Sequence, residues 1–122
     1  MNLEPLEVHQ DNRGAFVEAF KLPNDGQLSY VIAKHNETRG NHYHTRKTEH
    51  FLVVSGVAEM EVKDRESGNI MRVTVTGTNP IVVTVVPNHT HNITAKDGNC
   101  LFMIWCDEQF NPDDPDTYAE EV

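Results

Sequence analysis

The sequence predicts an all-β fold, a barrel or jelly roll with very little helix. Short segments rich in β-branched and aromatic residues recur along the 122 residues, and Gly, Pro and Asn separate nearly all of them. No long window shows the apolar period of an amphipathic helix. The length suits one core, because two domains within it would each be too small to bury enough apolar surface. We therefore expect a single domain over residues 1–122.

The strand pattern appears in residues 16–20, 28–34, 49–54, 57–63, 70–76, 81–86 and 100–106. Residues 57–63 alternate apolar and charged side chains, which is typical of a half-exposed strand. Ser67 and Gly68 mark a hairpin loop after it. Residues 81–86 and 100–105 are apolar at nearly every position, which predicts central strands covered on both faces.

The composition changes from about residue 111 to the end of the chain. This stretch holds Pro112 and Pro115 together with the acidic residues Asp113, Asp114, Asp116, Glu120 and Glu121. We expect an extended, solvated C-terminal tail.

The formal net charge of -9 argues against nucleic acid as a partner, because binding to its backbone requires a clustered basic surface. Arg39, Arg46 and Lys47 are nevertheless close in sequence to the histidine-rich segment. The local positive field predicts that an anionic small molecule, such as one with phosphate groups, is attracted there.

Two cysteines, Cys100 and Cys106, lie on one predicted strand. At about 3.3 Å per residue they are too far apart to form a disulfide with each other. The sequence shows no secretory leader pattern and no apolar run long enough for a membrane helix. These features favour a cytoplasmic protein without a membrane partner.

The densest polar feature is the segment that holds His42 and His44, followed by Glu49 at the start of a strand. In an extended segment residues i and i+2 share a face, so both imidazoles are expected to point into the barrel. Glu49 is an odd number of residues beyond His44, so it would point outward in an unbroken strand. A tight loop through residues 45–47 is therefore required.

A second pair, His89 and His91, follows the strand at 81–86, and at least one of the two is expected to reach the same cavity. His42, His44, Glu49 and His91 together form a ligand set suited to zinc, iron, manganese or nickel. The alternative is that the histidines are ordinary hydrogen-bonded or exposed residues. We adopt that interpretation for His9, His35 and His50, which lie outside the paired pattern.

These residues resemble the two sequence motifs of the cupin superfamily. The matching positions are Gly40, His42, His44, Glu49, Gly56, Pro87 and His91. Residues 11–18 and 38–43 are also similar to the substrate-binding and catalytic segments of the rhamnose-pathway sugar-nucleotide 3,5-epimerases. That resemblance implies that His42 acts as the base next to a ketone and that Arg13 and Arg39 hold the phosphates of a nucleotide sugar.

The chain also resembles the C-terminal cupin domain of the zinc-dependent reductase-epimerases that make UDP-N-acetyl-L-fucosamine for capsular polysaccharide. The matching stretches are residues 26–30, 37–44, 49–56, 90–93 and 103–118. Two features depart from the pattern. The sequence has no dinucleotide-binding fingerprint, so a reduction step would need a separate reductase. Asn88 and His89 occupy the places of a glycine and an aromatic residue, and His89 is a candidate substrate contact or further ligand.

The resemblance implies an epimerase that removes a proton next to the ketone of a nucleotide-linked 4-keto-6-deoxy sugar, with zinc as the cofactor and a homodimer as the assembly. His42 can serve as metal ligand or as base, but not as both through one nitrogen, and we favour the ligand. Lys34, Tyr30 or a metal-bound water are then the candidate proton carriers, and Arg46 joins the arginines as a candidate substrate contact. A 3,4-ketoisomerase on the same scaffold and a sugar-binding cupin without catalysis are the alternatives.

Overall fold

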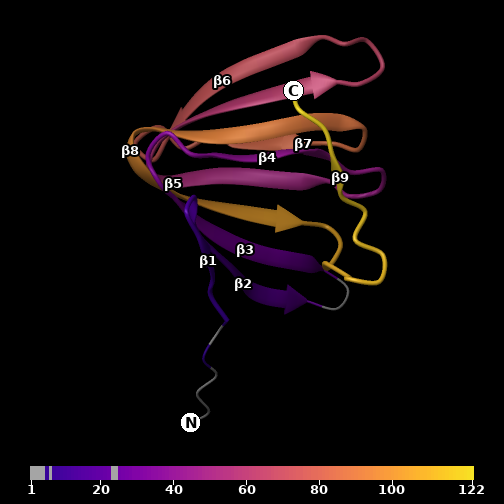
Figure 1. The fold of residues 1–122 in the computed structure, drawn as a ribbon, viewed down its shortest axis with the longest axis horizontal. Helices are drawn as coiled ribbons and strands as arrows, with labels where there is room; N and C mark the ends of the chain where they lie inside the picture. Colours follow the sequence, from indigo (N-terminus) through magenta and orange to yellow (C-terminus); the bar gives the residue numbers. More distant parts are fainter. Residues whose placement is uncertain (1–4, 6, 23–24) are drawn as a thin grey trace.

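The computed structural model describes residues 5, 7–22 and 25–122, and Figure 1 shows a single antiparallel sheet that curls around its own interior. The described residues form no helix, and none of them makes a helical segment able to cross a membrane. The all-β prediction is therefore confirmed. The strands are β1 (His9–Asp11), β2 (Gly14–Leu22), β3 (Gly26–Ala33), β4 (Thr38–Tyr43), β5 (Glu49–Asp64), β6 (Ile70–Thr76), β7 (Val82–Val85), β8 (His89–Cys106) and β9 (Tyr118–Ala119).

Two long strands, β5 and β8, organise the sheet. They pair with each other along both halves of their length, from Glu49 opposite Cys106 to Asp64 opposite His89. The second half of β8 also pairs with β3, and its first half pairs with β4. The histidine-bearing parts of β4 and β8 therefore lie side by side, with His42 opposite His91.

The long strand β5 bends at a glycine. In β5 the register shifts between Val53 and Val57, and Gly56 has a φ of 92° that favours glycine. A Cβ atom at Gly56 would lie 2.6 Å from the carbonyl oxygen of Asn99 on β8. The two strands expected at 49–54 and 57–63 are thus one bent strand, in which odd positions face inward before the bulge and even positions after it.

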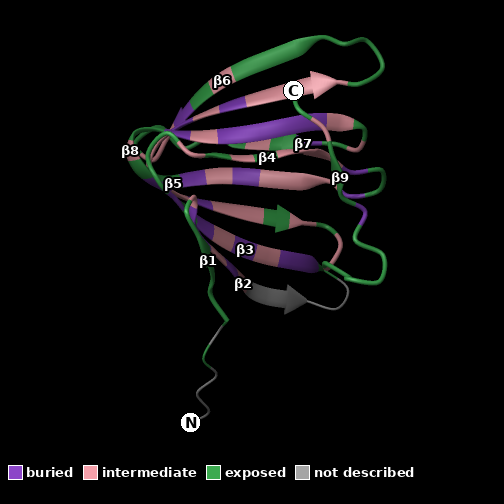
Figure 2. Ribbon diagram, viewed as in Figure 1, coloured by how far each residue is buried: buried purple, intermediate pink, exposed green. Residues whose placement is uncertain are grey.

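The apolar core fills one part of the interior and draws most of its residues from β5 and β8, where Figure 2 shows the buried positions, apolar and polar alike, in purple. Its largest fully buried apolar side chains are Phe102 and Met60. Phe51 joins the core at the boundary with the histidines, where its ring lies 5.7 Å from that of His91. The core therefore forms one wall of the polar site.

The prediction that residues 81–86 and 100–105 are covered on both faces is wrong for the outer face. Val82 is 58% exposed and Trp105 is 50% exposed. Val85 and Phe102, which face the interior, are buried as expected. Apolar residues at nearly every position indicate an apolar outer surface here rather than a second covering layer.

The C-terminal segment makes more contacts with the rest of the chain than a solvated tail would. It runs in yellow across one end of the barrel, and its strand β9 pairs with β4 (Figure 1). Most of its residues are exposed, but Asp116 is only 1% exposed. The expectation of a fully solvated tail is therefore wrong at Asp116, whose contacts are described next.

Candidate metal centre

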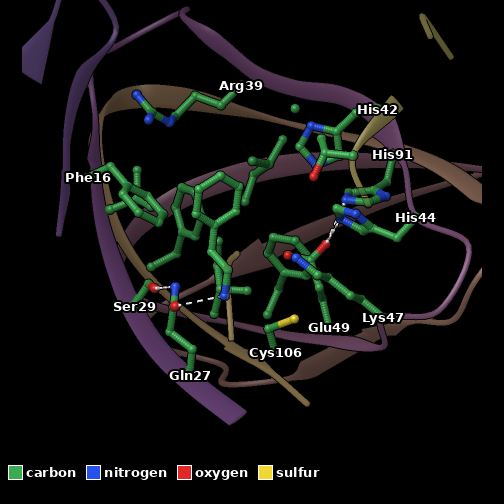
Figure 3. Close-up of a pocket in the computed structure, with 18 of the residues that line it drawn as sticks. Phe16, Gln27, Ser29, Arg39, His42, His44, Lys47, Glu49, His91 and Cys106 are labelled. Atoms are coloured by element: carbon green, nitrogen blue, oxygen red, sulfur yellow. Dashed lines mark hydrogen bonds and ion pairs between the residues drawn. The ribbon is translucent and has the colours of Figure 1, made fainter. Parts of the chain in front are cut away.

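Four side chains from three strands and a loop meet at one side of the interior (Figure 3). β4 supplies His42, the following loop His44, β5 Glu49 and β8 His91. One nitrogen or oxygen from each lies within 4.8 Å of the others. The structure thus brings together all four residues of the predicted ligand set.

The loop between His44 and Glu49 changes the direction of the side chains as the sequence requires. Asp116 from the C-terminal segment organises this loop by accepting hydrogen bonds from the backbone N–H groups of Thr45 at 3.0 Å and Arg46 at 2.9 Å, and from the Thr45 hydroxyl. Burial opposes the charge on Asp116, but these hydrogen bonds outweigh it and hold the pKa of its carboxyl well below its usual range. The loop is therefore fixed by a residue far away in sequence.

Backbone carbonyl groups orient two of the histidines. Nδ1 of His44 donates to the carbonyl oxygen of Asp116 at 2.7 Å, and Nδ1 of His91 donates to that of His89 at 3.0 Å. Each ring therefore turns Nε2 toward Oε1 of Glu49, at 2.9 Å for His44 and 3.0 Å for His91. This arrangement, in which a carbonyl fixes the far nitrogen, is typical of metal-binding histidines.

Nε2 of His91 gives the most direct sign that the cluster suits a metal ion. This buried nitrogen has no hydrogen-bond partner among the described residues, although Oε1 of Glu49 lies 3.0 Å away. Buried polar atoms normally have partners, and a lone pair directed at a cation is one explanation. Imidazole nitrogens with one carboxylate oxygen also match the donors preferred by zinc and other transition metals.

The charges in the cluster favour the ligand forms of Glu49 and His42 but the protonated form of His44. Burial opposes ionisation of Glu49, but His44 and His91 outweigh it and hold its pKa well below its usual range. Burial, with the adjacent His91, lowers the pKa of His42 to about 4, so this imidazole is neutral at neutral pH. Burial also disfavours the charge on His44, but the hydrogen bond to Glu49 and its negative charge raise the pKa of His44 in the metal-free protein.

The cluster opens on a cavity of about 450 Å³ inside the curled sheet. Arg39 lies at the opposite end from the histidines (Figure 3), and Arg13 also lines the cavity. Asp11 binds Arg13 at 2.6 Å and lies 3.9 Å from Arg39. Nη1 of Arg39 is buried and has no hydrogen-bond partner among the described residues. This end of the cavity therefore offers cationic N–H groups to an anion.

Four other predicted site residues do not line this cavity. Tyr30 lies between the cavity-lining residues Ser29 and Val31 on β3, so its side chain belongs to the outer face because alternate residues of a strand point in opposite directions. Lys34 lies beyond the end of β3 and is exposed. The structure gives no geometric support to either as a proton carrier.

The predicted substrate contacts Arg46 and His89 are also placed elsewhere. Arg46 forms ion pairs with Glu108 at 2.8 Å and Asp114 at 3.1 Å, so acidic side chains of the C-terminal region occupy its guanidinium. Nδ1 of His89 donates to the carbonyl oxygen of Pro87 at 3.0 Å. His89 supports His91 through its own carbonyl group rather than as a ligand.

Sequence reasoning missed several residues that do line the cavity. Lys47 was noted only for its charge, and His9 was interpreted as an ordinary exposed residue. Gln27 and Ser29 are buried, joined by a 3.1 Å hydrogen bond, and form part of the cavity wall (Figure 3). The alternation of polar residues at 27 and 29 within an otherwise apolar strand was the available signal.

Comparisons with known proteins agree with this description. The polysaccharide biosynthesis C-terminal domain family matches residues 9–118. The UDP-2-acetamido-2,6-beta-L-arabino-hexul-4-ose reductase of Pseudomonas aeruginosa is 39% identical over 118 residues, which are 96% of this chain and 32% of that protein. The crystal structure of the capsular polysaccharide assembling protein CapF of Staphylococcus aureus matches with a TM-score of 0.93 and 39% identity, over 97% of this chain and 35% of that one.

A more distant match supports the fold alone. The dTDP-6-deoxy-D-glucose-3,5-epimerase RmlC of Legionella pneumophila, in complex with dTDP-4-keto-L-rhamnose, has a TM-score of 0.68 and 17% identity, over 93% of this chain and 69% of that one. Together these matches confirm the predicted cupin-type barrel. The chain spans about a third of the length of the reductase and of CapF.

Proposed function

The chain belongs to the polysaccharide biosynthesis C-terminal domain family, and on this premise we propose that it is an epimerase of a nucleotide-linked 4-keto-6-deoxy sugar in surface polysaccharide synthesis. The observation that carries the proposal is that one cavity holds both a histidine and carboxylate cluster and an arginine pair. The first provides groups for proton transfer next to a ketone, and the second provides groups for phosphates. The names of the relatives, which refer to 4-keto sugars, support the same substrate class.

The sequence favours the ligand role for His42 over the role of base, but we propose, from its position in the cluster, that His42 abstracts the proton. Unlike His44 and His91, its ring has no backbone carbonyl group holding it among the described contacts, and it is the least buried member of the cluster. Its lowered pKa keeps the imidazole neutral and able to accept a proton. This assignment leaves His44, Glu49 and His91 as a set of three ligands, the usual number in catalytic zinc sites.

The bond changes are those of an enolisation. His42 takes the proton from the carbon next to the ketone, the C–H electron pair becomes a C=C bond, and the carbonyl electrons move to the oxygen. A divalent ion, which we propose is zinc, would supply Lewis-acid stabilisation of that oxygen when bound by the three ligands. Return of a proton from solvent to the opposite face of the carbon, with loss of the proton from His42, completes the inversion.

Arg13 and Arg39 are the proposed contacts to the phosphates of the nucleotide. Arginine presents several N–H donors in a planar fork that matches phosphate oxygens. Asp11 holds the Arg13 guanidinium by two hydrogen bonds, at 2.6 and 3.1 Å, and thereby orients it. The partly buried Arg39 keeps an unused N–H donor for the ligand.

Isotope exchange tests the proposed function. The protein is incubated in heavy water with UDP-linked 4-keto-6-deoxy sugars, and the sugars are analysed by mass spectrometry and NMR. We expect deuterium at a carbon next to the ketone, together with inverted configuration there, and loss of both in His42→Ala but not in His50→Ala. Full retention of hydrogen across the panel would contradict the proposal, and movement of the keto group would indicate the ketoisomerase instead.

The assembly, the partner protein and the location of this enzyme are also proposals. A homodimer is supported by the exposed apolar outer face, and a separate reductase is supported by the name of the Pseudomonas relative. The two free cysteines, Cys100 and Cys106, agree with a cytoplasmic location.

A further inference from the structure

Lys47 is a buried cation that neither the ligand set nor the arginine pair explains. It is only 4% exposed, although lysine is among the residues least often buried. It lines the cavity, and Figure 3 shows its side chain reaching inward from the loop toward the region of Glu49. A cation in such a place must be compensated by the protein or by a ligand.

The protein compensates Lys47 only in part. Its Nζ donates one hydrogen bond, to the carbonyl oxygen of Pro115 at 3.0 Å, and lies 5.4 Å from the centre of the Phe110 ring. No carboxylate of the described residues lies within ion-pair distance of this ammonium, and an ammonium carries three N–H groups. Two N–H donors are thus left for a molecule in the cavity.

The loop fixes the position of this ammonium. The backbone N–H of Lys47 lies 3.4 Å from the Asp116 carboxylate, which also binds the N–H groups of the two preceding residues. Pro115 and Asp116 therefore hold both ends of Lys47, its backbone and its ammonium. The cation is placed before any ligand arrives, as an electrostatic catalyst requires.

Resting on the proposed function, we infer that Lys47 is a further catalytic residue, which donates a hydrogen bond to the substrate oxygen that becomes negative as the proton leaves the adjacent carbon. In this role Lys47 is a hydrogen-bond donor and transfers no proton. Lys47 lines the cavity beside Glu49 (Figure 3), at the proposed reaction centre, whereas Arg13 and Arg39 serve the other end. In a desolvated cavity such a donor acts most strongly on the transition state.

The test compares Lys47→Met and Lys47→Arg with the wild type in the exchange assay. Methionine keeps the buried chain length but removes the charge, whereas arginine keeps the charge. We expect Lys47→Met to lower kcat by about 100-fold to 1000-fold with little change in KM, as loss of one oxyanion donor does, and Lys47→Arg to restore part of kcat. Lys96→Met, at an exposed lysine of β8, is the matched control and should leave kcat unchanged.

Metal content and thermal midpoint are measured for every variant. Lys47→Met with wild-type metal content and midpoint but low kcat supports the inference. A raised KM with unchanged kcat would assign Lys47 to substrate binding instead. Loss of metal or of folding in both Lys47→Met and Lys47→Arg would assign it a structural role. Either result overturns the inference. If Lys47→Met exchanges hydrogen at the wild-type rate, the inference about Lys47 is overturned but the proposed function stands. If the wild type shows no exchange, the proposed function is overturned as well.

Discussion

The direction of the Glu49 side chain shows how much a single residue depends on its setting. An uninterrupted strand from His44 would have turned Glu49 outward, but the loop between them brings its carboxylate within 2.9 Å of His44. The ligand types were readable from the sequence because they are local. The hydrogen bonds that hold the loop come from Asp116, and no local pattern predicted them.

At this scale the first prediction concerns metal binding. Replacing His44 with Ala removes one nitrogen donor to the metal. Loss of a residue that only hydrogen-bonds to a ligand costs about 10–100-fold in metal affinity, so loss of the ligand itself should cost more. His50→Ala is the control, since His50 lies on the outer face and bonds Thr84 at 2.9 Å. Elemental analysis of protein purified without added metal checks this. Full metal occupancy in His44→Ala would remove His44 from the ligand set.

The second prediction concerns Asp116 and pH. Asp116→Asn should destabilise the fold by about 1–3 kcal/mol at neutral pH, because hydrogen bonds to a charged, buried carboxylate are lost. The folded-state pKa of Asp116 lies below its unfolded value, so its contribution is present above the unfolded pKa and is lost as the pH falls through the folded one. The difference from wild type should therefore begin to shrink below about pH 5.

Urea unfolding of both proteins at several pH values, with a chelator present so that metal release does not contribute, measures this difference. A gap between variant and wild type that is the same at neutral and acidic pH would show that the charge of Asp116 does not stabilise the loop.

At the scale of elements, the strands were easier to locate than their continuity. The expected segments at 28–34, 70–76 and 100–106 correspond to β3, β6 and the second half of β8. Sequence reasoning split β5 in two and did not assign β1, β4 or β9 as strands. Short or polar strands lack the apolar alternation that marks a strand, and pairing partners distant in sequence stabilise them instead.

The close approach of β4 and β8 leads to a third prediction. Gly40 has a φ of 95°, and a Cβ atom there would lie 2.9 Å from the carbonyl oxygen of His91. Gly68, with a φ of 79°, has no heavy atom within 4 Å of the same position. Both Gly→Ala changes bear the cost of a left-handed conformation, about 1–2 kcal/mol, but only Gly40→Ala adds a clash, which costs about 1–3 kcal/mol more.

Urea unfolding of Gly40→Ala and Gly68→Ala measures this difference, and elemental analysis should show reduced metal in Gly40→Ala alone, because the clash there displaces the backbone of His91, a proposed ligand. Equal destabilisation by the two substitutions would mean that β4 and β8 can separate without cost.

For the whole molecule, the outer face of the sheet is the feature without an explanation inside one chain. β3, β8, β5 and β7 are neighbours, and they expose Ile32, Trp105, Val54 and Val82 on that face. Contiguous apolar surface of this kind commonly marks a protein interface. A second copy of the chain is the proposed partner, which would also cover unpaired edge strands.

Sedimentation velocity at several protein concentrations tests the homodimer. We expect Val82→Glu to shift the species toward monomer, because it places a charge in an apolar interface. Met71→Glu is the control, since Met71 is 75% exposed but lies on β6, outside this face. A wild type that sediments as a monomer at all concentrations would contradict the proposal.

The sequence by itself determined the fold class, the types of ligand and the sharing of one site by His42, His44 and His91. These conclusions depend on the two-residue period of a strand and on residue chemistry, both of which act over a few neighbouring positions. Only the tertiary structure decided that Lys47 points inward, that Tyr30 and Arg46 do not, and that Asp116 supports the site. Those outcomes depend on loops and on contacts between distant segments, where no period constrains the direction of a side chain.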